Sequence, residues 1–206
     1  MAAALQGAAA QAGRIGPNAI TRVAEVLRAR RGEAATAALF GRAGLLPYLT
    51  QPPEAMVDEA EVTRLHQVLR DSLGSAFAQE VAREAGTRTA DYLLAHRIPR
   101  PVQAVLKRLP APLAARLLLS AIRRHAWTFA GSGQFSHALD PGNERIMWLN
   151  IIRSPLCRPG DHTAACDYFA ATFEGVFGAM LGHDVRVVEA ECTSHGGPAC
   201  RFRLSW

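Results

Sequence analysis

Apolar residues recur at helical spacing near the start of the chain. Ile20, Val23 and Leu27 fall on one face of a helix that we expect over residues 18–31. Gly32 follows directly, and a glycine at this position commonly ends a helix because it adopts a left-handed backbone without strain. The pattern therefore predicts an opening helix that stops at Gly32.

The helical period continues in three later stretches. Asp58 can cap a helix whose apolar stripe runs to Leu73. Residues 75–96 keep the same period until prolines interrupt it, and residues 113–124 form another apolar helix after a second pair of prolines. The first two thirds of the chain are thus predicted to be mainly helical.

Short segments of aromatic and β-branched residues then replace the helical period. They cover residues 127–130, 134–139 and 145–152, and glycines or the Asp-Pro-Gly-Asn sequence at 140–143 separate them. Segments of this length, joined by tight turns, are typical of antiparallel strands. We expect an antiparallel meander here.

One more helix and two more strands complete the pattern. A strongly apolar helix is predicted over residues 163–181, followed by strands at 185–191 and 200–204 that are joined across two glycines. Helices first, then strands around one packed helix, indicate an α+β fold and not a doubly wound sheet. The predicted architecture is a set of N-terminal helices packed on a small antiparallel sheet.

Length and composition fit one globular domain. The chain has 206 residues, 49% hydrophobic and 20% charged. The Ala- and Gly-rich residues 1–16 are predicted to be a disordered tail, and residues 17–206 one domain with a mainly helical part (17–125) and a strand-rich part (126–206). No apolar run reaches the length of a membrane span, and no secretory signal is recognisable, so we expect a cytoplasmic protein.

The formal charge of +5 is unevenly distributed. No acidic residue lies between Asp91 and Asp140. This segment favours an anionic partner, which could be an acidic lipid surface, a ligand with carboxylates or nucleic acid; a solvated helix face is the alternative. Nucleic acid is not expected, because no recognition helix, RNP strand or zinc-finger spacing accompanies the charge. The basic residues of the segment are Arg97, Arg100, Lys107, Arg108, Arg116, Arg123 and Arg124.

The strongest chemical signal lies in the last quarter of the chain. Cys166 begins the apolar helix, and Glu189, Cys192 and Cys200 follow in the strand region. Three thiolates and one carboxylate converging from a helix and a hairpin would form the closed tetrahedral site of a structural Zn²⁺, although free cysteines are often only small buried hydrophobes. Rival ligands are His183, His195, Glu191 and Cys157.

Aromatic residues are concentrated in the same half of the chain, where they could line an apolar pocket. The alternative is that they simply form the core. They are Trp127, Phe129, Phe135, Trp148, Tyr168, Phe169, Phe173 and Phe177.

The C-terminal motif resembles that of the 4-vinyl reductase domain family. It comprises Cys166 at a helix start, Glu189-Ala-Glu-Cys192, a glycine-containing turn, and Cys200-Arg-Phe202. The resemblance is specific over residues 127–202. It implies a ligand-binding fold like that of the vesicle-transport TRAPP subunits, and zinc ligation by Cys166, Glu189, Cys192 and Cys200. It also implies a role in bacteriochlorophyll biosynthesis, and so in photosynthesis, through the 4-vinyl group of a divinyl magnesium tetrapyrrole.

A magnesium tetrapyrrole has an open axial position that suits imidazole. His125 and His137 flank the aromatic segments and are the candidate axial ligands, whereas His66 is expected to face solvent. Arg123 or Arg124 could hold a propionate through paired hydrogen bonds, and Arg145 is a further candidate. Phe129, Phe169 and Phe173, with Trp127 and Trp148, would line the ligand pocket.

Reduction of a vinyl group requires a hydride source, but no dinucleotide-binding, P-loop or iron-sulfur motif is present. We therefore expect a protein that binds the tetrapyrrole and delivers it to pathway enzymes. The alternatives are an NADPH-dependent 4-vinyl reductase whose cofactor site is not evident, and a small-molecule sensor or adaptor. The resemblance also leaves open peripheral contact with the photosynthetic membrane and a homodimer.

Overall fold

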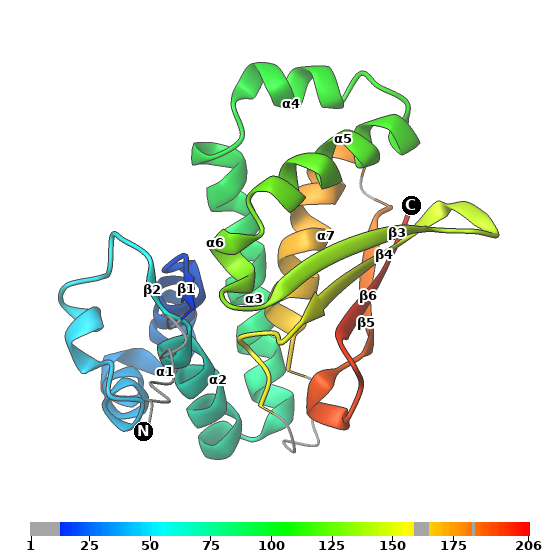
Figure 1. Cartoon of the computed structure of the whole chain (residues 1–206). Helices are drawn as coiled ribbons and strands as arrows, with labels where there is room; N and C mark the ends of the chain where they lie inside the picture. The colour runs from blue at the N-terminus through cyan, green and yellow to red at the C-terminus, as the bar shows by residue number, and fades with distance from the viewer. Residues whose placement is uncertain (1–12, 159–164, 183) are drawn as a thin grey trace, which may run out of the picture.

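Helices and strands form separate layers in the computed structural model, which describes residues 13–158, 165–182 and 184–206 (Figure 1). The helices are α1 (Asn18–Arg42), α2 (Glu59–Leu73), α3 (Ser75–His96), α4 (Arg100–Leu106), α5 (Ala111–Arg124), α6 (Trp127–Ala130) and α7 (Asp167–Leu181). The strands are β1 (Arg14–Ile15), β2 (Val57–Asp58), β3 (Gln134–Asp140), β4 (Asn143–Ile152), β5 (Arg186–Glu191) and β6 (Cys200–Ser205). The predicted α+β class is confirmed.

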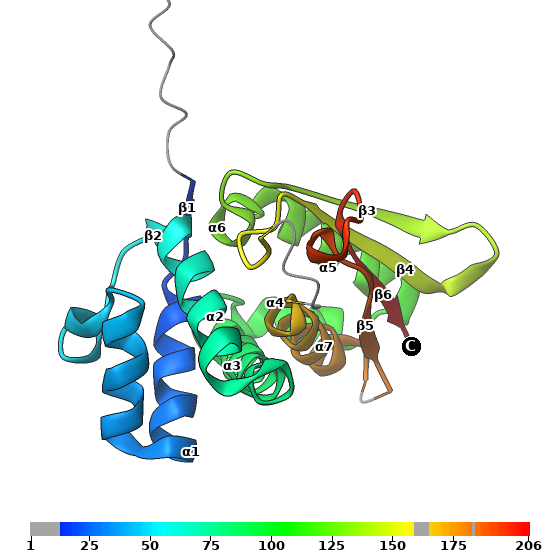
Figure 2. The same ribbon diagram turned by 90° about the horizontal axis from the view of Figure 1, so that it is seen from below.

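The main sheet has the antiparallel order β3-β4-β6-β5. His137 pairs with Leu149, and Leu149 pairs with Phe202, so these three side chains share one face of the sheet. Leu149 and Phe202 are fully buried there. Helices α5 and α7 contact this inner face, and the opposite face carries no helix in Figure 2.

Helix α7 lies between α3 and the sheet (Figures 1 and 2). Two glycines allow the close approach of α3 and α7: a Cβ on Gly86 would lie 2.3 Å from the carbonyl oxygen of Tyr168, and one on Gly175 would lie 2.6 Å from Cβ of Ala90. Helices α1 and α2 pack on the far side of α3. Helix α7 is therefore the centre of the fold.

Several predicted elements are confirmed because their local signals agree with their packing. Asp58 caps α2 by accepting a hydrogen bond from the Ala60 amide at 2.8 Å. Helix α3 spans the predicted residues 75–96, and β3 and β4 match the predicted hairpin to within two residues.

The first predicted helix is too short. Gly32 has φ of 77° and ends a helical segment as expected, but the chain turns there and continues in helix to Arg42. Buried Leu39 and Phe40 in the second segment supply the apolar contacts that sustain it. Helix α4 was also not predicted, because it is a short segment enclosed by prolines.

The predicted strand at 127–130 is wrong, since these residues form α6. The amides of Thr128 and Phe129 donate to the carbonyls of His125 and Ala126, which makes a helical turn. Aromatic content suggested a strand, but no sheet partner is available where α5 ends.

Two further boundaries differ from the prediction. Arg14 and Ile15 belong to β1, which pairs with β2, and Ile15 is 2% exposed; the disordered tail was therefore drawn too far, and residues 1–12 lie outside the described part. Helix α7 begins at Asp167, while residues 163 and 164 of the predicted helix are not described. His66, expected in solvent, is buried against Tyr168.

Within the described residues, no helix has both the length and the apolar character needed to cross a bilayer.

Candidate metal centre

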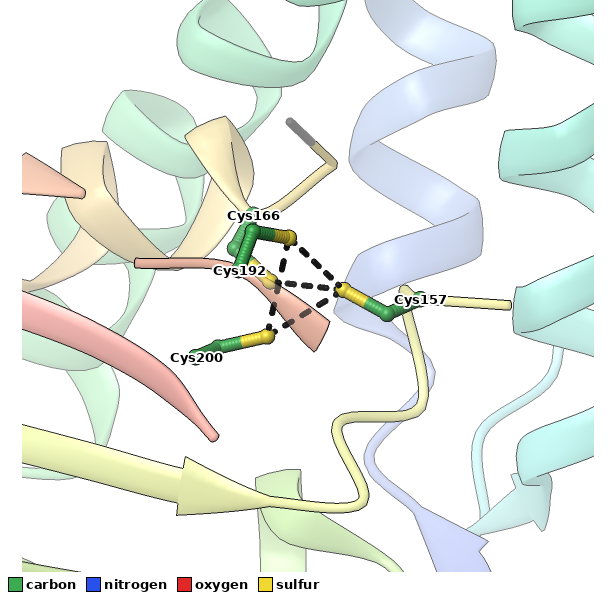
Figure 3. A group of neighbouring side chains, drawn as sticks. All are labelled: Cys157, Cys166, Cys192 and Cys200. Carbon is green, nitrogen blue, oxygen red and sulfur yellow. Dashed lines mark hydrogen bonds between the residues drawn. The ribbon is translucent and has the colours of Figure 1, made fainter. Parts of the chain in front are cut away.

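Four cysteine sulfurs meet at one end of the sheet. Figure 3 shows Cys157, Cys166, Cys192 and Cys200 pointing toward a common centre. Cys157 Sγ lies 3.2 Å from Cys166 Sγ, 3.5 Å from Cys192 Sγ and 3.3 Å from Cys200 Sγ, and all four sulfurs lie within 4.8 Å of one another. The four residues could hold a metal ion.

Each cysteine comes from a different element. Cys157 is in the loop after β4, Cys166 is the N-cap of α7, Cys192 follows β5, and Cys200 begins β6. The last three are at most 3% exposed. A metal ion held by all four would connect the loop, the central helix and two strands.

Polar groups surround the sulfurs. Ser154 Oγ lies 3.3 Å from Cys166 Sγ, and Thr193 Oγ1 lies 3.3 Å from Cys200 Sγ. Cys166 also lies at the N-terminus of α7, where the helix dipole favours negative charge. These contacts favour thiolates at the cluster.

The four thiols have very different proton affinities. Hydrogen bonding from Cys166 lowers the pKa of Cys157 to about 7, and hydrogen bonding from Cys157 lowers the pKa of Cys192. Burial raises the pKa of Cys166, and the hydrogen bond with Cys157 raises that of Cys200. The cluster can carry several thiolates together only if a cation offsets their charge.

Glu189 stands beside the cluster, and Cys157 occupies the place in it that the sequence assigned to Glu189. The Cys166 amide donates to Glu189 Oε2 at 3.3 Å, and Glu189 Oε1 is buried without a hydrogen-bond partner in the described structure. Burial, followed by the charge of Cys192, raises the pKa of Glu189 to about 9. The structure therefore brings together three of the four predicted ligands and adds a rival, Cys157.

A signal for Cys157 was present in the sequence. The chain has four cysteines, all in its last quarter, and four cysteines are a common structural zinc set. Cys157 was ranked below Glu189 because it lies in a proline-containing loop, where no helix or strand period predicts its direction.

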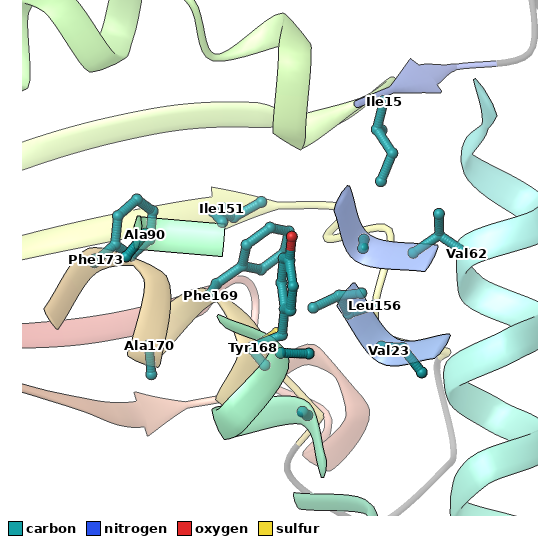
Figure 4. Packing of buried hydrophobic residues seen from close by; sticks show 14 of the residues in the cluster. Ile15, Val23, Val62, Ala90, Ile151, Leu156, Tyr168, Phe169, Ala170 and Phe173 are labelled. Carbon is teal, nitrogen blue, oxygen red and sulfur yellow. The ribbon is translucent and has the colours of Figure 1, made fainter. Parts of the chain in front are cut away.

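The predicted aromatic pocket is largely filled by its own side chains. Phe129 packs against Phe135 with ring centroids 5.4 Å apart and against Phe173 at 5.9 Å, and Phe169 stacks on Phe173 at 6.4 Å. Figure 4 shows Phe169 and Phe173 projecting from α7 among other buried residues, including Ile151. Phe129, Phe169 and Phe173 therefore act as core between α7 and the sheet, although Phe129 and Phe135 are only half-buried.

The two predicted tryptophans do not join this aromatic cluster. Trp127 is 61% exposed. Trp148 points to the outer face of the sheet, because its neighbours on β4 point inward; its indole donates to Asp140, and Arg201 lies 4.0 Å above its ring. As lining residues of one inner pocket, these two predictions are wrong.

The two candidate histidines differ in their surroundings. His125 is exposed at the end of α5, with its Nδ1 2.9 Å from the Ala121 carbonyl. His137 is half-buried on the inner face of β3, and its Nδ1 is buried without a hydrogen-bond partner in the described structure. Burial, and then Arg123, lower the pKa of His137. Arg123 thus lies near His137, and Arg124 is exposed beside it on α5.

A cavity of about 620 Å³ opens at the other end of α5. It is lined by Ala111, Pro112, Asn143, Glu144, Arg145, Leu181, Gly182, Asp184, Val185 and Trp206. Of the ligand residues considered from sequence, only Arg145 belongs to this lining.

The fold is shared with solved H-NOX structures. An H-NOX protein from K. algicida aligns with a TM-score of 0.60 over 93% of this chain and 96% of its own, at 10% identity. A second structure, titled "Probing the function of heme distortion in the H-NOX family", aligns with a TM-score of 0.59 over 92% and 94%, at 14% identity.

The fold and the cysteine cluster together define a protein with a 4-vinyl reductase domain, since the family model of that domain matches residues 147–205, which include all four cysteines. The "Bacteriochlorophyll synthase 23 kDa chain" of Cereibacter sphaeroides is 40% identical over 97% of this chain and 94% of its own length. The Rhodobacter capsulatus protein of the same name is 37% identical over 93% and 86%. The chain belongs to this family of bacteriochlorophyll synthase 23 kDa chains, which confirms the predicted family.

Proposed function

We propose that the protein binds a divinyl magnesium tetrapyrrole of bacteriochlorophyll biosynthesis and supports reduction of its 4-vinyl group by presenting it to a pathway enzyme. The names of the two relatives support a role in bacteriochlorophyll biosynthesis. The fold is also that of proteins for which one title names heme, another tetrapyrrole. The kinship with TRAPP subunits stays a prediction.

The observation that carries this proposal is the unpartnered imidazole of His137. Its Nδ1 is buried without a hydrogen bond to the described residues, and burial with the nearby Arg123 lowers its pKa. A neutral imidazole nitrogen with no other partner is a suitable axial ligand for a magnesium ion. His125 is the weaker candidate, because its Nδ1 already contacts a backbone carbonyl.

The surroundings of His137 suit a flat ligand with acidic side chains. The ring of Phe135 lies 6.3 Å from the ring of His137, and Arg123 on α5 can hold a propionate. The cavity of about 620 Å³ begins at the opposite end of the same helix and includes Arg145. A macrocycle between α5 and the β3–β4 hairpin would have a guanidinium at each end.

We further propose that the cysteine cluster holds a structural zinc ion. Zinc–sulfur bonds of about 2.3 Å in a tetrahedron place the sulfurs about 3.8 Å apart. The distance between Cys192 Sγ and Cys200 Sγ is 3.8 Å, and the shorter separations around Cys157 need only small side-chain shifts. The zinc ion would brace α7 against β5 and β6 and take no part in reduction.

Binding can be tested by adding divinyl protochlorophyllide to the purified protein and recording the Soret band. We expect a shifted band for the wild type and for His125→Ala. His137→Ala should bind at least about tenfold more weakly, which corresponds to the loss of about 1.4 kcal/mol. Because Nδ1 of His137 has no partner to lose, this variant should melt at the wild-type temperature.

Two outcomes would contradict the proposal. An unchanged wild-type spectrum would remove tetrapyrrole binding altogether. Reduction of the vinyl group by the pure protein with NADPH would favour the reductase alternative over presentation to a partner.

A further inference from the structure

Helix α5 has apolar residues on two faces. Its inner face is buried, whereas Leu113 and Leu117 lie one turn apart on the outer face and are 45% and 49% exposed. A helix at the surface of a globular protein ordinarily presents polar residues on this side. The buried residues are Ala114, Ala115, Leu118 and Leu119.

Helix α4 repeats the arrangement beside α5. Val102 is 47% exposed and Val105 is 57% exposed, while Leu106 alone is buried in the helix. The two helices lie next to each other at the top of Figure 1, where no other labelled element covers them. We call the outer side of these helices, defined by Val102, Val105, Leu113 and Leu117, the α4–α5 surface.

Exposed basic residues surround these apolar side chains. Arg100, Lys107, Arg108 and Arg116 are all exposed, and they take part in none of the ion pairs among the described residues. Arginines elsewhere are paired: Arg30, for example, lies 2.6 Å from Glu84. The α4–α5 surface therefore combines unpaired positive charge with exposed aliphatic groups.

We propose that the α4–α5 surface docks the protein on an anionic lipid bilayer. Such a bilayer meets both requirements at once, because phosphate headgroups attract the basic residues and the acyl boundary accepts valine and leucine side chains. Nucleic acid would satisfy the charge but leave the aliphatic groups in water. The proposal is independent of tetrapyrrole binding, since His137 and the cavity are not part of this surface.

Vesicle co-sedimentation of the full chain tests the proposal. We expect the wild type to bind vesicles of phosphatidylcholine with phosphatidylglycerol, to bind pure phosphatidylcholine weakly, and to be released as salt screens the charges. Arg108→Gln/Arg116→Gln should weaken binding about thirtyfold, at about 1 kcal/mol for each basic residue. Val105→Ser/Leu117→Ser should weaken it at least about tenfold.

The matched control is Arg186→Gln/Val188→Ser on β5, where Arg186 is exposed and Val188 is 60% exposed. It should bind like the wild type, and circular dichroism should show that all three variants are folded. Equal binding of the wild type to both vesicle types, or equal losses in test and control variants, would overturn the proposal. So would a wild type that ignores vesicles but forms a dimer that Val105→Ser/Leu117→Ser disrupts.

Discussion

The two ends of the sheet differ in how completely their interactions are made. At the closed end, the cysteine cluster, α3 and α7 bury their polar groups with partners: Tyr168 Oη lies 2.9 Å from Thr89 Oγ1, and Thr172 donates to Gly86. At the open end, α5 and β3 leave an unpartnered nitrogen on His137 and a cavity beside Arg145. One end is completed by the chain itself, and the other provides groups that a ligand can complete.

The largest test of this contrast is the removal of one sulfur from the closed end. Cys157→Ser should lose bound zinc and at least about 4 kcal/mol of unfolding free energy, because metal-binding energy is folding energy in such a site. Glu189→Gln should keep its zinc, since Glu189 lies beside the four sulfurs. Metal analysis and urea unfolding of both variants provide the measurement; zinc loss only in Glu189→Gln would restore the ligand set predicted from sequence.

A smaller effect is expected from the buried imidazole of the closed end. Burial, and then Arg70, lower the pKa of His66 from 6.5 to about 4. The unfolded state therefore gains a proton first as the pH falls, and the wild type should lose about 3 kcal/mol of stability between pH 6.5 and pH 4.

His66→Gln should lack this part of the pH dependence, because glutamine does not titrate. The two proteins are compared by urea unfolding at a series of pH values, and the difference between their stabilities should shrink as the pH falls. Parallel curves for the two proteins would contradict the burial of His66.

The smallest effect concerns the contact between α3 and α7. Gly86→Ala should destabilise the protein by about 1–3 kcal/mol, because the new methyl group would meet the Tyr168 carbonyl oxygen. Gly178→Ala on α7 is the matched control: no atom lies within 4 Å of its added Cβ, and the better helix propensity should add up to about 1 kcal/mol. Thermal unfolding of both variants measures the difference, and equal melting temperatures would show that the two helices are less closely packed.

Local signals predicted the elements whose packing agrees with them. The Asp58 cap and the apolar period of α3 are examples, because caps and helical faces depend on neighbouring residues. Residues 127–130 were mispredicted because four residues carry too little period to separate a helical turn from a strand. Whether a strand could form there depended on a sheet edge that only the folded chain defines.

The candidate site was predicted in composition but not in arrangement. Cys166, Cys192 and Cys200 were found from their spacing, whereas Cys157 enters from a loop whose path depends on tertiary contacts. The direction of Trp148 depends on the register of β4 with β6, which places Trp148 opposite Arg203 on the outer face. Sequence pattern identifies the residues of a strand more readily than the face on which each one lies.

The order of elements along the chain has a consequence for biosynthesis. Helices α1 to α5 all precede Cys157, and the fourth sulfur, Cys200, leaves the ribosome a few seconds later at about 5–20 residues per second. During that interval α3 has no α7 to cover it. Insertion of the metal is thus a late step, and a cell short of zinc should accumulate chains with formed helices and an uncovered apolar side that chaperones would bind.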